Sequence, residues 1–182
     1  MNEQQAAETL ARWEADERAV RARLHGETGW ARPEQVIGKP GMALFDAIFS
    51  GQLPAPPIGE TLDFLPVDIR PGRAVFQGRP LERHYNPMGT VHGGWFCTLL
   101  DSAVGCAVHS SLPAGKAYTT LELKVNIVRA LTKKVPLVRA EGVAIHVGGQ
   151  VATAEGRLTG PDGKLYAHAT TTCLVFDFPS KQ

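Results

Sequence analysis

One long apolar stripe in the second half of the chain limits the folds that this sequence can adopt. Apolar residues recur there with the spacing of a single helical face: Phe96, Leu99, Leu100, Ala103, Val104, Ala107 and Val108. The pattern predicts a helix of about four turns over residues 95–110. Segments with strand-like alternation flank it on both sides, so we expect a sheet to bury this helix.

The segments around this helix are typical of β-strands. Their composition and alternation predict strands over residues 62–70, 74–81, 118–129, 135–147, 150–158 and 165–176. Turn sequences at residues 71–72, 148–149 and 160–163 join neighbouring strands. The order is two strands, one helix and four strands. This order favours an α+β fold with a curved antiparallel sheet around a central helix over a βαβ arrangement.

Side-chain size and alternation predict how the strands face the helix. Every second residue is small over residues 138–144 and 152–156, and small side chains let a bulky element approach a sheet closely. The strand at 118–129 alternates more fully. We expect one of its faces to carry Leu121, Leu123, Val125 and Ile127. We expect the other face to carry Thr120, Glu122, Lys124 and Asn126.

The N-terminal part of the chain differs from the rest. A thin apolar stripe predicts a peripheral helix over residues 3–25, and Gly and Pro mark a connector over residues 26–40. A short apolar run then predicts a two-turn helix over residues 42–49, before an extended, proline-rich segment. We therefore expect a helical extension and connector over residues 1–40, and one domain over residues 41–182.

Charge and composition exclude several classes of protein. The net charge is +1 and no long run of like charge occurs, so we expect neither nucleic acid nor a membrane as a partner. No apolar segment is long enough for a membrane span, and we expect no signal peptide. The three cysteines have no C-x-x-C spacing and fit reduced thiols, which predicts a cytoplasmic protein.

The start of the predicted central helix carries a pair of glycines, Gly93 and Gly94. Glycines at a helix N-terminus leave backbone N–H groups uncovered where the helix dipole is positive. Such a position can bind an anion or stabilise a developing oxyanion. The alternative is that the two glycines only allow a tight turn into the helix, and the residues by themselves leave both interpretations open.

Asp101 is the second unusual residue of this helix. It lies off the apolar stripe and shares a face with Gly94, Cys97 and Gly105. We expect another backbone or a ligand to approach this face of small residues and to shield the carboxylate from water. A shielded carboxylate can serve as a base or a nucleophile. The alternative, a solvated helix Asp, is disfavoured because charged neighbours are missing from this face.

Other side chains near the glycines are weaker candidates. His92 adjoins them and can orient the loop or the substrate, while Asn86 precedes a proline and is either a site residue or an ordinary turn residue. Cys97 has no base near it in the sequence, which favours packing over nucleophilic catalysis. The histidines show no metal-ligand spacing, so no metal site is expected.

Residues 86–103, Asn-Pro-Met-Gly-Thr-Val-His-Gly-Gly-Trp-Phe-Cys-Thr-Leu-Leu-Asp-Ser-Ala, resemble the signature of PaaI-like acyl-CoA thioesterases of hotdog fold. The resemblance extends from about residue 53 to residue 176 and includes the segments 118–126 and 152–156. It implies a hotdog fold, an acyl-CoA substrate with a fatty or aromatic acyl group, and no cofactor.

The resemblance also implies a role for each site residue. Gly94 N–H would polarise the thioester carbonyl, and Gly93 and His92 would shape the loop around it. Asp101 would activate water or attack the carbonyl, assisted by Thr120. Asn86 would hold the water or the substrate near the sulfur, and Trp95 would bear on the fit of the acyl group.

Two other functions on the same fold are alternatives to thioester hydrolysis. A hotdog enoyl-CoA hydratase uses a paired Asp and His around an Asn-Pro step, and that pairing is missing here. A non-catalytic acyl-CoA-binding protein would lack the carboxylate at position 101 and would carry a DNA-binding element. The mixed charge of the N-terminal segment is unsuited to reading DNA.

Two further expectations concern coenzyme A and the assembly. Arg129, Lys133 and Lys134 either hold the CoA phosphates or form an ordinary solvated turn. On one helix, Gly94 and Asp101 lie about 10.5 Å apart along the axis, too far to act on one carbonyl. We therefore expect a homodimer with shared active sites, and the resemblance implies that it pairs into a dimer of dimers.

Overall fold

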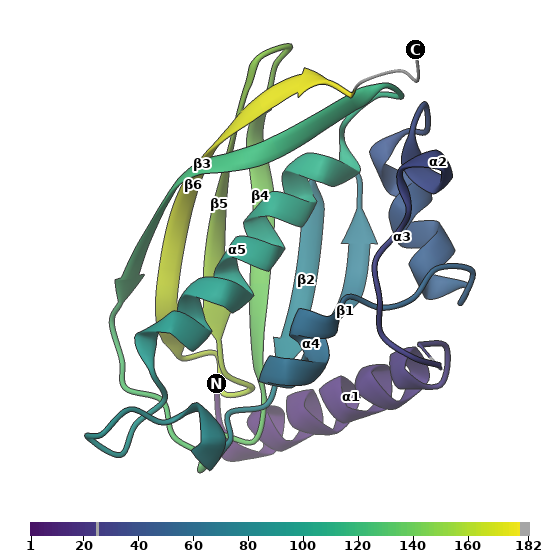
Figure 1. The fold of residues 1–182 in the computed structure, drawn as a ribbon. Coiled ribbons are helices and arrows are strands. Elements are labelled where there is room, and N and C mark those ends of the chain that lie inside the picture. Colours follow the sequence, from purple (N-terminus) through teal and green to yellow (C-terminus); the bar gives the residue numbers. More distant parts are fainter. Residues whose placement is uncertain (25, 179–182) are drawn as a thin grey trace.

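The structure, a computed structural model, describes residues 1–24 and 26–178. At its centre is a six-stranded antiparallel sheet with the strand order β1-β2-β4-β5-β6-β3 (Figure 1). The strands are β1 (Phe64–Arg70), β2 (Arg73–Gly78), β3 (Lys116–Ile127), β4 (Val138–Val147), β5 (Val151–Thr159) and β6 (Leu165–Asp177). Strands β1 and β3 form the two edges of this sheet.

One long helix, α5 (Gly93–Ser110), crosses the concave face of the sheet (Figure 1). It begins two residues before the predicted start and ends at the predicted residue. Most of its apolar stripe has no exposed surface: Leu99, Leu100, Ala103, Val104, Ala107 and Val108. The expected hotdog fold, an antiparallel sheet curved around one central helix, is confirmed.

Two glycines of the sheet allow α5 to come very close. A Cβ atom on Gly142 of β4 would lie 2.3 Å from the carbonyl oxygen of Ala103. A Cβ atom on Gly156 of β5 would lie 2.7 Å from Cγ1 of Val104. Both distances are shorter than real carbon contacts, so neither position has room for a side chain. The expectation that small residues mark the approach of a bulky element is confirmed.

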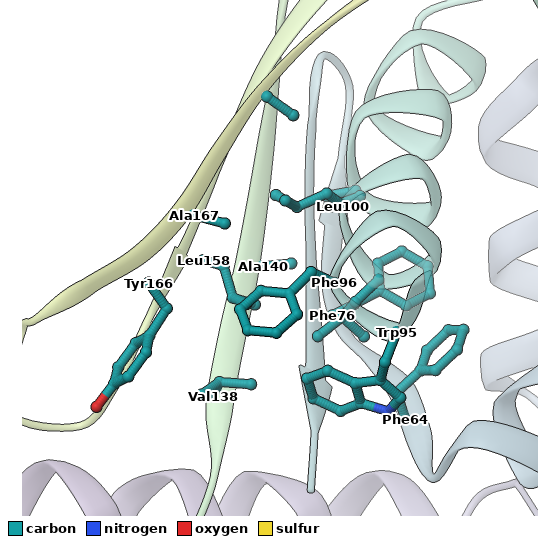
Figure 2. Packing of buried hydrophobic residues seen from close by; sticks show 14 of the residues in the cluster. Phe64, Phe76, Trp95, Phe96, Leu100, Val138, Ala140, Leu158, Tyr166 and Ala167 are labelled. Atoms are coloured by element: carbon teal, nitrogen blue, oxygen red, sulfur yellow. The ribbon is translucent and has the colours of Figure 1, made fainter. Parts of the chain in front are cut away.

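Aromatic side chains fix the first turn of α5 (Figure 2). Trp95 and Phe96 pack edge to face with 6.2 Å between ring centres, and Phe64 packs against Phe76 at 6.0 Å. The Trp95 indole N–H also donates a hydrogen bond of 2.9 Å to the carbonyl of Leu62. These contacts hold in place the part of the helix that carries the glycine pair.

Further helical elements precede and follow the first two strands. Their bounds are α1 (Glu3–Arg21), α2 (Pro33–Val36), α3 (Gly41–Phe49), α4 (Pro57–Leu62) and the 3-10 turn η1 (Glu82–His84). Asn2 and Gln5 cap the start of α1 reciprocally, which satisfies two of its free N–H groups. In the described part of the chain, no helix is both long enough and apolar enough to cross a membrane.

Helix α1 packs on the face of the sheet opposite α5. Phe76 and Gly78 face α5, so Gln77 between them points to the outer face, where α1 buries it to 1% exposure. The Gln77 amide donates to the Trp13 carbonyl at 3.1 Å and to Glu17 at 3.0 Å. The sheet is therefore covered on both faces near β2 and β4.

Charges hold α1 in this place. Glu17, only 8% exposed, accepts hydrogen bonds from Arg21 at 2.9 Å and from Arg79 at 3.2 Å. Burial alone would raise the pKa of Glu17, but the hydrogen bonds and charges of Arg21, Arg79 and Gln77 outweigh it and lower that pKa. Arg139 of β4 pairs with Asp16 at 2.7 Å on the same surface.

The sequence-based boundaries need several corrections. Helix α2 lies within the expected connector, and the strand expected from residue 135 begins at Val138. The N-terminal helix, expected over residues 3–25, ends at Arg21, and residue 25 lies outside the described residues. The strand expected over residues 74–81 ends at Gly78. The prolines of residues 53–57 predict extended backbone and no helix, but Pro57 is the first residue of α4, a position that tolerates proline.

A substitution of Gly142 tests the close contact of helix and sheet. We expect Gly142→Ala to lower the free energy of unfolding by about 1–3 kcal/mol, because its methyl group collides with the backbone of Ala103. Gly149 is the control, since a Cβ atom there meets nothing within 4 Å and its φ is not positive. Urea unfolding of Gly149→Ala should match the parent within about 0.5 kcal/mol. Equal stability of both variants would contradict the packing described here.

Candidate active site

The loop before α5 is organised by Asn86. Its Oδ1 accepts the N–H groups of Met88 and Thr90 at 2.9 and 3.3 Å, and its Nδ2 donates to Thr90 Oγ1 at 3.0 Å. The amide is thus engaged within its own loop, as the turn interpretation predicts. Asn86 nevertheless borders the same hollow as Gly93 at the start of α5.

The side chain of His92 caps α5. Its Nδ1 accepts the Gly94 N–H at 2.8 Å, so the N–H that the family resemblance implies for polarising the carbonyl is already bonded. Among the described residues, no acceptor lies within hydrogen-bonding distance of the Gly93 N–H. Gly93 therefore presents the free donor, and Gly94 can offer its own only when His92 turns away.

Asp101 and Thr120 are brought together. Thr120 Oγ1 donates to Asp101 Oδ1 at 3.2 Å, and the Asp101 side chain is half-buried between α5 and the edge strand β3. This contact depends on a β-bulge, because the register of β3 against β6 shifts between Thr120 and Glu122. The expected alternation in β3 was therefore wrong at this point. Thr120 faces α5, while Leu121 is 61% exposed.

The sequence does not predict the hydrogen bond between Thr171 and Cys173 on the strand next to Thr120. Cys173 of β6 lies directly opposite Thr120 and 3.9 Å from Thr171 Oγ1. Thr171 donates its hydroxyl proton to the Glu122 carbonyl at 2.7 Å, so the thiol is the donor in its contact with Thr171. Only the strand register places these groups together, and no local sequence signal predicts that register.

The thiols near Asp101 are poor nucleophiles. Burial, followed by the charge of Asp101, raises the pKa of Cys97 and raises that of Cys106 to about 12. Burial also raises the pKa of Cys173. These thiols stay protonated at neutral pH and react slowly. The carboxylate of Asp101 is therefore the better candidate for the reacting group on this face.

The face of small residues around Asp101 is not left open along its whole length. We expected another backbone or a ligand to approach it, but a Cβ atom on Gly105 would lie 2.7 Å from the Tyr118 hydroxyl. At Gly105, the chain's own Tyr118 therefore fills the space. Cys97 and Asp101 remain half-buried on the rest of this face.

The predicted substrate-binding residues lie in different surroundings. Trp95 is 4% exposed and stacks on His84, so it acts as a wall behind His92 and Gly94. Arg129 is exposed and borders the hollow that contains Asn86 and Gly93. Lys133 forms an ion pair with Glu82 and donates its backbone N–H to Tyr85 at 2.7 Å. Lys134 is exposed and, among the described residues, has no ion-pair partner.

Within one chain these residues form two separate groups. The loop end holds Asn86, His92 and the glycine pair. Asp101, which is bonded to Thr120 of β3, lies eight residues beyond Gly93, about 12 Å along the helix axis. No group of three or more His, Cys, Asp or Glu side chains in residues 1–24 and 26–178 is arranged to hold a metal ion. The arrangement offers a hydrogen-bond donor at the start of α5 and a carboxylate about two turns further along the same helix.

Comparisons with known proteins agree with this geometry. The thioesterase superfamily matches residues 88–167, which include the glycine pair, Asp101 and Thr120. A 1,4-dihydroxy-2-naphthoyl-CoA hydrolase of Listeria monocytogenes is 28% identical over 116 residues, which are 64% of this chain and 93% of that protein. The superfamily match thus covers His92, the glycine pair, Asp101 and Thr120, whereas Asn86 lies just before it.

Solved structures show the same fold. A phenylacetic acid degradation-related protein from Ralstonia eutropha superposes with a TM-score of 0.65 at 28% identity, over 71% of this chain and 98% of its own. A mutant of the phenylacetic acid degradation protein PaaI from Thermus thermophilus gives a TM-score of 0.58 at 28% identity, over 65% and 97% of the two chains.

Proposed function

We propose that this chain, which is a PaaI-like thioesterase of hotdog fold and therefore a thioester hydrolase, acts on aromatic acyl groups carried by coenzyme A. Thioester hydrolysis takes precedence over the hydratase and the non-catalytic binding protein that the sequence left open. The aromatic acyl group is supported by the names of the relatives, a naphthoyl-CoA hydrolase and two phenylacetic acid degradation proteins.

The observation that carries this proposal is a carboxylate held by a neighbouring hydroxyl. Thr120 fixes one oxygen of Asp101 at 3.2 Å and leaves the other free to act. As a base, Asp101 takes a proton from a water molecule while the oxygen of that water attacks the thioester carbonyl carbon. As a nucleophile, its oxygen forms an anhydride that water then hydrolyses. In both cases the C–S bond breaks and the CoA thiolate leaves and gains a proton.

The carbonyl oxygen needs a donor as negative charge develops on it. We assign this role to the Gly93 N–H, which is free and lies in the first turn of α5, where the dipole favours an anion. The Gly94 N–H adds a second donor if His92 releases it. Asn86 shapes the loop and borders the hollow in which water or the thioester sulfur would lie.

A shared site between two chains follows from the distance of about 12 Å between Gly93 and Asp101. Strand β3 is an edge strand whose outer backbone groups are free to pair with a second chain, and Leu121 and Ile127 on it are 61% and 46% exposed. A two-fold axis beside β3 sets two α5 helices antiparallel, so that each Asp101 meets the partner's helix start. Further pairing into a dimer of dimers remains a prediction.

We also propose a location and a division of the chain. Three free cysteines are consistent with a reducing cytoplasm. The helical extension over residues 1–40 is placed outside the catalytic domain over residues 41–182. The superfamily match, which begins at residue 88, supports a catalytic role for the later part only.

The reaction is tested by hydrolysis of an acyl-CoA series, with the free thiol detected. We expect turnover of phenylacetyl-CoA or another aromatic acyl-CoA, and a loss of about 10²-fold or more in kcat for Asp101→Asn, which keeps the shape but removes the base. Asp46→Asn on α3 is the control, because Asp46 is an exposed helical Asp. Near-parental kcat of folded Asp101→Asn would refute the assignment.

The proposed contacts between basic residues and the CoA phosphates are tested by substitutions that remove the positive charge. Arg129→Gln should raise KM at low ionic strength with little change in kcat, because Arg129 borders the hollow beside Gly93. Lys134→Gln should act similarly. Lys133→Gln is expected to have a smaller effect, since Glu82 already neutralises Lys133. An unchanged KM for all three variants at low salt would show that these residues form an ordinary solvated turn and do not bind the CoA phosphates.

Mixed dimers test the shared site. Gly93→Pro removes the free N–H at the first helical position, which suits proline, and His92 before it is already extended at ψ 139°. Gly93→Ala keeps the N–H and is the control. Homodimers of Gly93→Pro and of Asp101→Ala should both be nearly inactive, whereas refolded mixtures should regain activity through one intact site per heterodimer. Heterodimers as inactive as their parents would contradict the shared site.

A further inference from the structure

Tyr118 of β3 occupies the space next to the reacting carboxylate. Gly105 follows Asp101 by one turn on the same face of α5, and a Cβ atom there would lie 2.7 Å from the Tyr118 hydroxyl and 3.3 Å from its ring. The phenol therefore fills the gap that the missing side chain leaves. Without this ring, the open face beside Asp101 would continue along the helix.

A hollow also borders Tyr118. It has a volume of about 240 Å³ and is bordered by Tyr118 and His109 of the hotdog fold, by Val36 and Gly38 of the N-terminal extension and by Leu44 of α3. Its lining is mostly apolar. Tyr118 thus borders both the face of α5 that carries Asp101 and an apolar space to which the N-terminal part of the chain contributes.

The contacts of the Tyr118 ring hold it in this position. It packs beside His109 with 5.6 Å between ring centres, and His109 in turn packs edge to face against Phe45 of α3 at 5.4 Å. Burial raises the pKa of Tyr118, so the hydroxyl stays neutral at physiological pH. Packing against His109 and against Gly105 therefore holds the ring in place.

We propose that Tyr118 forms the end wall of the acyl pocket and restricts the enzyme to compact acyl groups. The inference rests on the proposed function, in which the thioester carbonyl lies at Asp101. An acyl group that extends from there along α5, away from the helix start, meets the Tyr118 ring after about one turn, about 6 Å. A phenyl ring fits such a distance, whereas a long fatty chain does not.

Removal of the phenol should connect the two spaces. It has about as many heavy atoms as a hexyl chain, so Tyr118→Ala opens room for a longer acyl group that ends in the apolar hollow. One methylene group more or less in an apolar pocket changes the specificity constant by about 10–200-fold. We therefore expect the ratio of kcat/KM for decanoyl-CoA to that for phenylacetyl-CoA to rise at least about tenfold.

The experiment compares three variants with the parent enzyme on phenylacetyl-CoA and decanoyl-CoA. Tyr118→Phe is the matched control, because it keeps the ring and should keep the parental ratio. Tyr118→Leu fills part of the space and should give an intermediate ratio. It also tests the wall if Tyr118→Ala does not fold. The integrity of each variant is checked by thermal unfolding.

The outcomes separate this inference from the proposed function. If the parent hydrolyses neither substrate nor any other acyl-CoA, the proposed function fails first. If the parent hydrolyses decanoyl-CoA as well as phenylacetyl-CoA, or if the ratio is unchanged in folded Tyr118→Ala and Tyr118→Leu, the wall is refuted while the function stands. If Tyr118→Phe also changes the ratio of the two kcat/KM values, selectivity depends on the hydroxyl, and the proposed role of the ring is overturned.

Discussion

The contact between α5 and the glycine of β4 is the constraint on which the rest of the molecule depends. Because Gly142 has no side chain, the Ala103 carbonyl can lie against the backbone of the sheet, which fixes the depth and the rotation of the helix. That rotation turns Asp101 toward β3 and buries the opposite stripe. A larger residue in β4 would displace the helix, and Asp101 and Thr120 would separate.

The start of the same helix shows competition for a donor. A helix N-terminus has several N–H groups without a partner, and here the His92 side chain takes one of them, at Gly94. The one at Gly93 is left for a ligand. Capping by His92 therefore occupies the Gly94 N–H, and in the mechanism that we propose it leaves the Gly93 N–H to polarise the carbonyl.

Local patterns predicted the elements, but not the contacts between distant strands. Periodicity located α5 to within two residues, and small residues correctly marked where it meets the sheet. The bulge after Thr120 reverses the side-chain alternation of β3, and nothing in the alternating sequence indicates it. Likewise, the position of Tyr118 on Gly105 depends on how two elements pack, which neither segment encodes alone. The residue types of the candidate site were thus predictable, whereas their partners were not.

The N-terminal helices lie outside the superfamily match, which begins at residue 88, and they pack against different parts of the fold. Helix α1 is attached to the outer face of the sheet by the buried Glu17 and by Arg139, away from the carboxylate. Helix α3 instead packs its Phe45 against His109 near the end of α5, and His109 supports the ring of Tyr118. The two helices therefore differ in what they can influence: α1 stabilises the sheet, whereas α3 has a direct path through two aromatic contacts to the wall beside Asp101.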